Sequence, residues 1–101
     1  MTYIQEFTNF SQNLPQRQIT SEVEADQLYQ HSASLSTALI NEVFQYMQDI
    51  LKTARDTLHG DNLRQKEQET ISKYQDFANK VEILNLLNVA LIQDKKRQLN
   101  Q

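Results

Sequence analysis

The stretch Gln68–Ile92, QETISKYQDFANKVEILNLLNVALI, begins as an amphipathic helix and ends with apolar residues on nearly every side. Its apolar positions first recur at alternating steps of four and three, which is typical of a helix that packs against one neighbour. Towards Ile92 further apolar residues widen that stripe, and a single neighbouring helix cannot cover them all. This surplus is the strongest functional signal in the sequence.

The composition indicates an all-α protein with few and long helices. The 101 residues include one Gly and one Pro, although turns depend on these two residue types. A sheet protein of this size would need several hairpin turns. With 39% hydrophobic residues, the chain can bury one core, so we expect a single helical domain.

We expect a long antiparallel helical hairpin with a short N-terminal helix, a three-helix arrangement at about residues 2–12, 21–59 and 61–97. Pro15 and the polar residues after it predict a linker behind the first helix. The few residues around Gly60 predict a tight connection, which makes the two long helices antiparallel neighbours. Their facing positions follow heptad-like steps, typical of a coiled-coil pairing: Ile40, Phe44, Met47, Leu51, Ala54 and Leu58 against Thr70, Tyr74, Phe77, Val81, Leu84, Asn88 and Leu91.

Local signals place the helix ends. Ser21 and Glu24 form a predicted capping box, in which each side chain accepts a hydrogen bond from the other residue's backbone N–H. Gly60 is expected in the left-handed conformation after the second helix, with Asp61 as the N-cap of the third. The serine-rich patch at residues 31–34 is expected to fray or kink the second helix.

The surplus apolar side chains need to be buried, and the sequence leaves two alternatives for what covers them. The N-terminal helix can fold back near Leu28, Leu35 and Leu87, or a partner protein or second copy can cover the surface. On the second alternative, Val81→Asp should suppress assembly. The interaction residues predicted from this surplus are Val81, Leu84, Leu86, Leu87, Val89 and Leu91 of the third helix, with Tyr3, Phe7 and Phe10 of the first.

No pattern in the sequence predicts chemistry. His31 and His59 are the only histidines, and they fit a helix surface position and a helix cap better than a catalytic or metal-binding role. We therefore expect no enzyme, no catalytic residue, no cofactor and no metal site. A net charge of −3 without a basic stripe argues against nucleic acid, and about twelve consecutive largely apolar residues are too few for a membrane span.

One segment resembles a known family. The pattern Gln68-Glu69-x-Ile71-Ser72-x-Tyr74-x-x-Phe77-x-x-x-Val81-x-x-Leu84 resembles the C-terminal helix of inner-rod subunits of bacterial type III secretion systems, and more loosely that of the needle subunits. The segment Leu39-Ile40-Asn41-Glu42-Val43 is similar to the one that precedes this helix in the rod family. The resemblance covers about a third of the chain. Rod and needle subunits end in an apolar tail, whereas this chain ends in the polar segment 94–101. A second family, the secreted helical hairpins that carry Trp-x-Gly at the turn, fits less well, because the turn of this chain lacks the Trp.

The resemblance implies a helical hairpin that polymerises through its last helix. It also implies that MTYIQEFTNFSQ acts as an uncleaved export signal and that the protein is exported. The first twenty residues lack the basic start and apolar run of a secretory signal, so we expect the protein to be cytoplasmic at synthesis. The leading prediction is therefore a non-enzymatic protein–protein interaction or assembly subunit, with a rod-like secretion component as its specific form. The alternative is a cytoplasmic helical adaptor, chaperone or inhibitor that binds one partner protein through the same apolar face.

Overall fold

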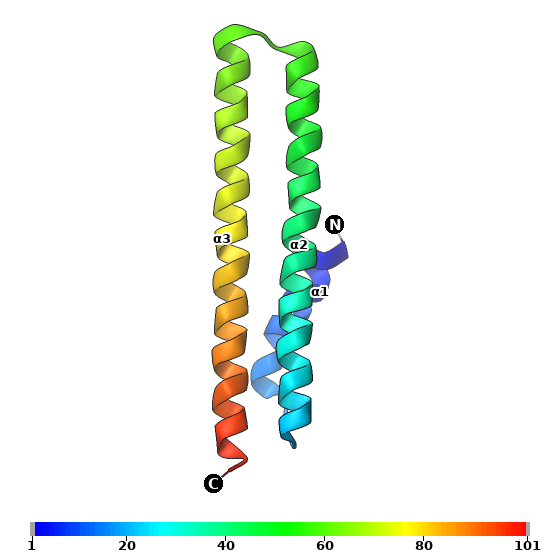
Figure 1. The fold of residues 1–101 in the computed structure, drawn as a ribbon, viewed down its shortest axis with the longest axis vertical. Coiled ribbons are helices and arrows are strands. Elements are labelled where there is room, and N and C mark those ends of the chain that lie inside the picture. The colour runs from blue at the N-terminus through cyan, green and yellow to red at the C-terminus, as the bar shows by residue number, and fades with distance from the viewer. Residues whose placement is uncertain (1, 101) are drawn as a thin grey trace.

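The computed structural model describes residues 2–100, which form an all-α hairpin with a short N-terminal helix (Figure 1). The elements are α1 (Thr2–Asn13), the 3-10 turn η1 (Leu14–Gln16), α2 (Glu22–Thr57) and α3 (Gly60–Gln98). The helices α2 and α3 run antiparallel over nearly their whole length, in a rod of 63 × 19 × 17 Å. The predicted fold class is confirmed, and each helix boundary lies within two residues of its expected position.

The start of α2 has half of the predicted capping box. The hydroxyl of Ser21 accepts a hydrogen bond from the Glu24 N–H at 3.1 Å, as expected. The Glu24 carboxylate, however, accepts from the N–H and hydroxyl of Thr20 rather than from the Ser21 backbone. The predicted bond from the Ser21 backbone is therefore wrong, because the donor is Thr20, one residue earlier. The hydrogen bond from the Thr20 backbone is the main cause that lowers the pKa of Glu24.

The serine-rich patch does not break α2, contrary to expectation. Ser32 is fully buried against the other helices, and Ser36 donates its hydroxyl hydrogen to the carbonyl of Ala33. Ser32 donates to a side chain of α3, and Ser36 bonds to a carbonyl of its own helix, an arrangement that helices tolerate. The helix therefore continues unbroken from Glu22 to Thr57.

The connection between α2 and α3 depends on the only glycine. Gly60 has a φ of +60°, in the left-handed region where a side chain is disfavoured, as predicted. Its place in the turn differs slightly, because α3 begins at Gly60 and the N-cap is His59 rather than Asp61. The N–H of Leu58 closes the end of α2 on the carbonyl of Ala54.

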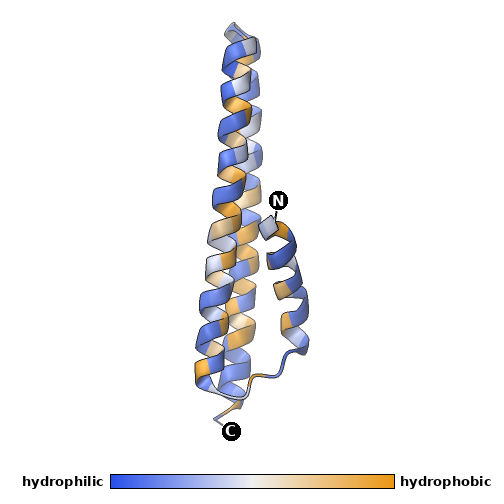
Figure 2. Cartoon of the chain, turned by 90° about the vertical axis from the view of Figure 1, so that its right-hand side faces the viewer, coloured by the Kyte–Doolittle hydropathy of each residue, from blue (hydrophilic) through white to orange (hydrophobic). Residues whose placement is uncertain are grey.

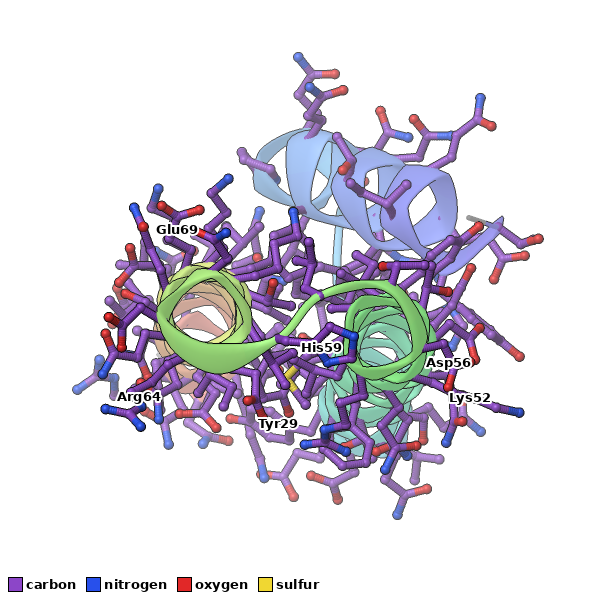
Figure 3. All side chains as sticks on the ribbon, turned by 90° about the horizontal axis from the view of Figure 1, so that it is seen from above. Tyr29, Lys52, Asp56, His59, Arg64 and Glu69 are labelled. Carbon is purple, nitrogen blue, oxygen red and sulfur yellow. The ribbon has the colours of Figure 1, made fainter. Side chains whose placement is uncertain are left out.

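Helix α1 packs on one face of the hairpin, beside the half that is farther from the turn (Figure 2). Viewed from above, α1 lies on one side of the plane of α2 and α3, and the labelled Tyr29 and Arg64 lie towards the other side (Figure 3). The backbone N–H of Tyr3 lies 3.4 Å from the Glu42 carboxylate, which marks how far along α2 the helix reaches. Beyond Glu42 no described segment covers this face of the hairpin.

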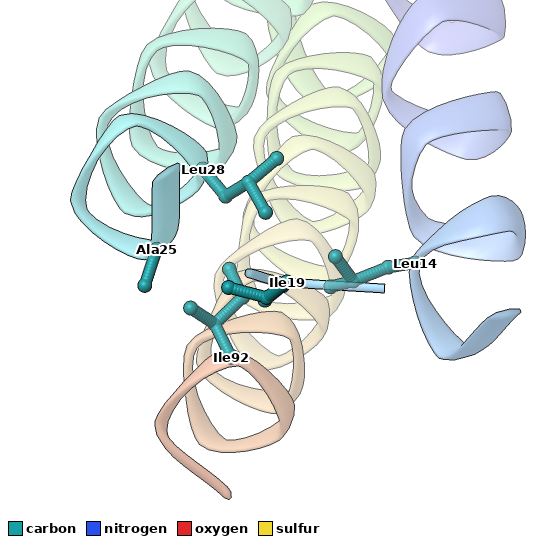
Figure 4. Close-up of a cluster of buried hydrophobic side chains, with 5 residues drawn as sticks. All are labelled: Leu14, Ile19, Ala25, Leu28 and Ile92. Carbon is teal, nitrogen blue, oxygen red and sulfur yellow. The ribbon is translucent and has the colours of Figure 1, made fainter. Parts of the chain in front are cut away.

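Two apolar clusters hold the three helices together. In the first, Phe7 of α1 packs with Leu35 and Leu39 of α2 and Val81 of α3. The second lies near the open end of the hairpin and contains Leu14, Ile19, Ala25, Leu28 and Ile92 (Figure 4). Ile19 brings the linker itself into this core. The self-covering alternative is therefore realised at Leu28 and Leu35.

The substitution Phe7→Ala tests whether α1 is an integral part of the fold. Phe7 is 2% exposed and joins both hairpin helices, so its removal should cost about 3–5 kcal/mol of unfolding free energy. Urea unfolding followed by circular dichroism measures this cost. Ile4→Ala, on the exposed side of the same helix, is the control and should cost less than half as much.

The pKa of Glu24 predicts a specific acid sensitivity. A glutamate whose pKa is lower in the folded chain than in the unfolded chain stabilises the fold above its unfolded pKa, and this stability is lost as the pH falls through the folded pKa. Glu24→Gln should therefore flatten the loss of stability below about pH 4.3. Thermal unfolding between pH 3 and pH 7 measures it, and an unchanged profile in the variant would contradict the assignment.

Candidate interaction surface

A stripe of apolar side chains runs along α3 and faces solvent. Ile83, Leu86 and Leu87 are 56%, 65% and 61% exposed, and Ala90 is exposed beside them. Their spacing of i, i+3, i+4 and i+7 places all four on one face of the helix. We call Ile83, Leu86, Leu87 and Ala90 the outer stripe.

The outer stripe points away from the core of the protein. A helix turns by about 100° per residue, so the centre of the stripe lies roughly opposite Val81, Asn88 and Ile92. Those three side chains are buried between the helices. Neither α2 nor α1 can reach the stripe, because α2 packs on the opposite side of α3 and α1 on an adjacent side. A contiguous exposed apolar stripe of this kind is typical of a protein interaction site.

The structure divides the nine predicted interaction residues into three groups. Phe7 and Val81 are buried in the chain's own core, so a partner cannot contact them in this structure. Phe10, Leu84, Val89 and Leu91 are half-buried at the edges of the helix contacts. Tyr3, Leu86 and Leu87 are exposed and available to a partner.

Two expectations about particular residues need correction. On the self-covering alternative the N-terminal helix would lie near Leu87, but Leu87 points outward because α1 packs against the side of α3 that carries Leu84 and Leu91. Val81→Asp was expected to suppress assembly. Because Val81 is 5% exposed, that substitution would place a charge inside the core and unfold the protein, so it does not test assembly.

A second apolar surface lies on the hairpin beyond the end of α1. Two hollows of about 410 and 240 Å³ share Tyr46, Ile50 and Lys66, and together they form a continuous groove between α2 and α3. We call this the distal groove; its lining residues are Val43, Tyr46, Met47, Asp49, Ile50, Thr53, Ala54, Thr57, Leu58, Lys66, Thr70, Lys73, Tyr74 and Phe77. Most of the lining is apolar, as expected for a site that receives an apolar side chain.

A buried polar network joins the three helices. The Asn88 amide donates to the hydroxyl of Ser11 at 2.9 Å and to that of Ser32 at 3.2 Å, and Ser32 donates to the amide oxygen of Asn85 at 2.6 Å. Asn88 is 4% exposed, and its hydrogen bonds are made within the chain. No buried side-chain nitrogen or oxygen from residue 2 to residue 100 lacks a partner.

The polar C-terminal turns are held against the rest of the fold. The Lys95 ammonium donates to the carbonyl oxygens of Pro15 and Arg17, at 3.0 and 2.9 Å. Lys96 pairs with Asp26 at 3.2 Å, a contact that raises the pKa of Lys96. These contacts fix the end of α3 to the linker and to α2. The departure from an apolar tail therefore has a structural role within this chain.

Several residues of these contacts were not singled out from the sequence. Ser11, Ser32 and Asn85 looked like ordinary polar positions, and Ile19 followed a polar run in the linker. A signal was nevertheless present. Ser32 and Ser36 continue the three- and four-residue steps of the buried positions in the first half of α2, which are Ala25, Leu28, Ser32, Leu35, Ser36 and Leu39. Small hydroxyl residues at such positions indicate a close helix approach with local hydrogen bonds.

The two histidines lie apart from each other. His31 packs edge-on against Phe10, with ring centroids 5.2 Å apart, and His59 caps α3 at the far end of the rod. Within the part of the chain that the structure describes, no three His, Asp or Glu side chains gather as they would around a metal ion. Over the same residues, no helix has the length and hydropathy needed to cross a bilayer.

Comparison with known proteins gives no match: no family model, curated protein or solved structure is similar to this chain. The likeness of residues 68–84 to type III secretion rod subunits therefore remains a prediction from the sequence. Function has to be argued from the two apolar surfaces.

Asn88→Ala tests the buried network. The substitution removes two hydrogen bonds at a buried site, so we expect the unfolding free energy to fall by about 1–3 kcal/mol. Urea unfolding gives the value, and hydrogen exchange should show α1 losing protection before α2. Asn79→Ala, at an exposed position of the same helix, is the matched control. Equal stability in the two variants would contradict a structural role for the network.

Proposed function

We propose that the protein is a non-enzymatic assembly subunit that associates with other protein chains through the outer stripe. The observation that supports this proposal is the position of Ile83, Leu86 and Leu87, more than half exposed and on the side of α3 opposite the core. Each large apolar side chain left in water forgoes about 1.5–3 kcal/mol of burial free energy. These residues do not contact the core, so the core does not require them to be apolar. Burial by another protein chain is the simplest explanation for apolar residues at these positions.

The specific form that we propose is a rod-like component of a type III secretion apparatus. The support for it is the sequence pattern of residues 68–84, which lies directly before the outer stripe on the same helix. In such a subunit the last helix makes the contacts between copies. The protein would then be cytoplasmic at synthesis and exported, with residues 1–12 as the export signal. Electron microscopy of the concentrated protein should show helical filaments if this form is right.

A helical adaptor, chaperone or inhibitor is the second candidate. It is favoured by the closed core, since α1 covers the hairpin and the buried polar side chains of residues 2–100 all have partners within the chain. Such a unit can fold alone and bind one partner protein. The two candidates differ in their behaviour with concentration, because an adaptor keeps a constant small mass and an assembly subunit does not.

Leu87→Glu tests the proposed assembly. In sedimentation over a concentration series, the wild-type mass should rise, and the variant should need about tenfold higher concentration or more to reach the same mass. Because Leu87 is 61% exposed, the substitution should change the unfolding free energy by no more than about 0.5 kcal/mol. A change in association without a change in stability separates an interface from a core residue.

Val23→Glu is the matched control, because Val23 is a 67% exposed apolar residue at the start of α2 and lies far from the stripe in sequence. An acidic residue is also favourable in the first turn of a helix, so the control should be as stable as the wild type. A wild-type mass that stays that of one chain at every concentration would reject the assembly subunit and leave the adaptor. Equal effects of the two substitutions would show that the stripe is not the contact surface.

A further inference from the structure

We propose that the distal groove of one copy receives the outer stripe of a second copy, so that the protein associates head to tail through two different surfaces. This inference rests on the proposed assembly function and identifies the partner surface. Four observations support it: the continuity of the groove with the α1 contact, the spacing of the stripe, the charges around both surfaces, and the arrangement of both surfaces on one chain.

The distal groove continues the groove in which α1 lies. Val43 and Phe77 line the distal groove and also pack against the cluster around Phe7. On α2, the residues beneath α1 and those of the groove recur at heptad-compatible steps and form one stripe, made of Leu35, Leu39, Tyr46, Ile50, Thr53 and Thr57. The same face of the hairpin is therefore covered by a helix up to Glu42 and left bare beyond it.

The occupied half of the groove shows what kind of ligand the other half fits. Helix α1 contributes Phe7 and Phe10, and the 3-10 turn η1 that follows it contributes Leu14, so that anchors spaced three and four residues apart enter the two core clusters. This is helix-in-groove recognition, in which anchors at i, i+3, i+4 and i+7 enter an apolar groove. The outer stripe, Ile83 to Ala90, has this same spacing on an exposed helix face. The chain thus carries both a helical ligand and a groove suited to one.

The charges around the two surfaces are opposite in balance. Lys66 and Lys73 line the groove together with a single acid, Asp49. On α3, Glu82 directly precedes the stripe and Asp76 lies two turns before it, with a single base, Lys80, between them, while Asp94 is paired with Arg97. Among residues 2–100, neither groove lysine and neither Asp76 nor Glu82 takes part in an ion pair. Complementary charges of this kind orient two surfaces and favour the correct partner.

A single chain cannot join the two surfaces to each other. The stripe and one wall of the groove both belong to α3, a continuous helix, so the stripe cannot fold into the groove of its own molecule. Helix α1 cannot fill the distal groove either, because its aromatic anchors are used in the core. A contact between two unlike surfaces leaves one of each free at the ends of a dimer, so further copies can add.

Complementation between two defective variants tests this arrangement. Leu87→Glu alters the stripe and leaves the groove intact, and Tyr46→Glu alters the groove and leaves the stripe intact. Tyr46 is 54% exposed, so this variant should fold; Ile50→Glu provides a second groove variant, and circular dichroism checks the helicity of each. In sedimentation velocity, each variant alone should need about tenfold higher concentration or more to associate. An equimolar mixture should form a one-to-one complex that does not grow, because only one intact stripe–groove pair is available.

The possible outcomes separate this inference from the proposed function. If Leu87→Glu is defective and Tyr46→Glu associates like the wild type, the stripe binds elsewhere, so the groove inference fails and the assembly function stands. If both variants are defective but do not pair when mixed, the two surfaces do not meet and the inference also fails. A strictly monomeric wild type, whose groove or stripe is then left for a different protein, rejects both proposals.

Discussion

Two helices that lie side by side can each bury only the stripe that faces the other, and the structure of this protein depends on that limit. Helices α2 and α3 are 36 and 39 residues long, and both carry more apolar surface than their mutual contact covers. Part of the excess is buried by the N-terminal segment, through Phe7 of α1, Leu14 of η1 and the linker residue Ile19. What α1 cannot reach is left as the outer stripe and the distal groove. The two surfaces are therefore what remains when a short helix is packed on a long hairpin.

Polar contacts determine where along the hairpin α1 is placed. Apolar packing alone is nondirectional, and a short amphipathic helix could slide along a groove that is apolar from end to end. Asn88 prevents this, because its amide must reach Ser11 of α1 and Ser32 of α2 at the same time. Lys95 adds a second fixed point at the carbonyl oxygens of Pro15 and Arg17. Register is thus set by a few buried or tethered polar groups, and it leaves the distal groove open.

The fold was largely predictable from the sequence, and the surfaces were only partly so. Scarcity of Gly and Pro, heptad steps and Gly60 determine a helical hairpin by local rules that need no tertiary information. The burial of individual residues cannot be predicted from local rules, because it depends on the side of α3 against which α1 packs. Val81 on the seam and Leu87 beside it were both predicted to contact a partner, yet Val81 is in the core and Leu87 in solvent. The distal groove has residues from both long helices, so it became visible only once their register was known.

The separation of the two surfaces along the rod also bears on how copies could be arranged. The outer stripe lies in the half of the hairpin that carries α1, whereas the distal groove lies in the half next to the turn. A contact between them therefore shifts each copy along the rod axis relative to its neighbour instead of placing the two level. Each added copy is shifted and rotated by the same amount relative to the one before it. Repeating this step generates a helical array, unless the rotation brings the last copy back to the first and closes a ring. The same geometry that makes the monomer asymmetric would in this way determine the form of the assembly.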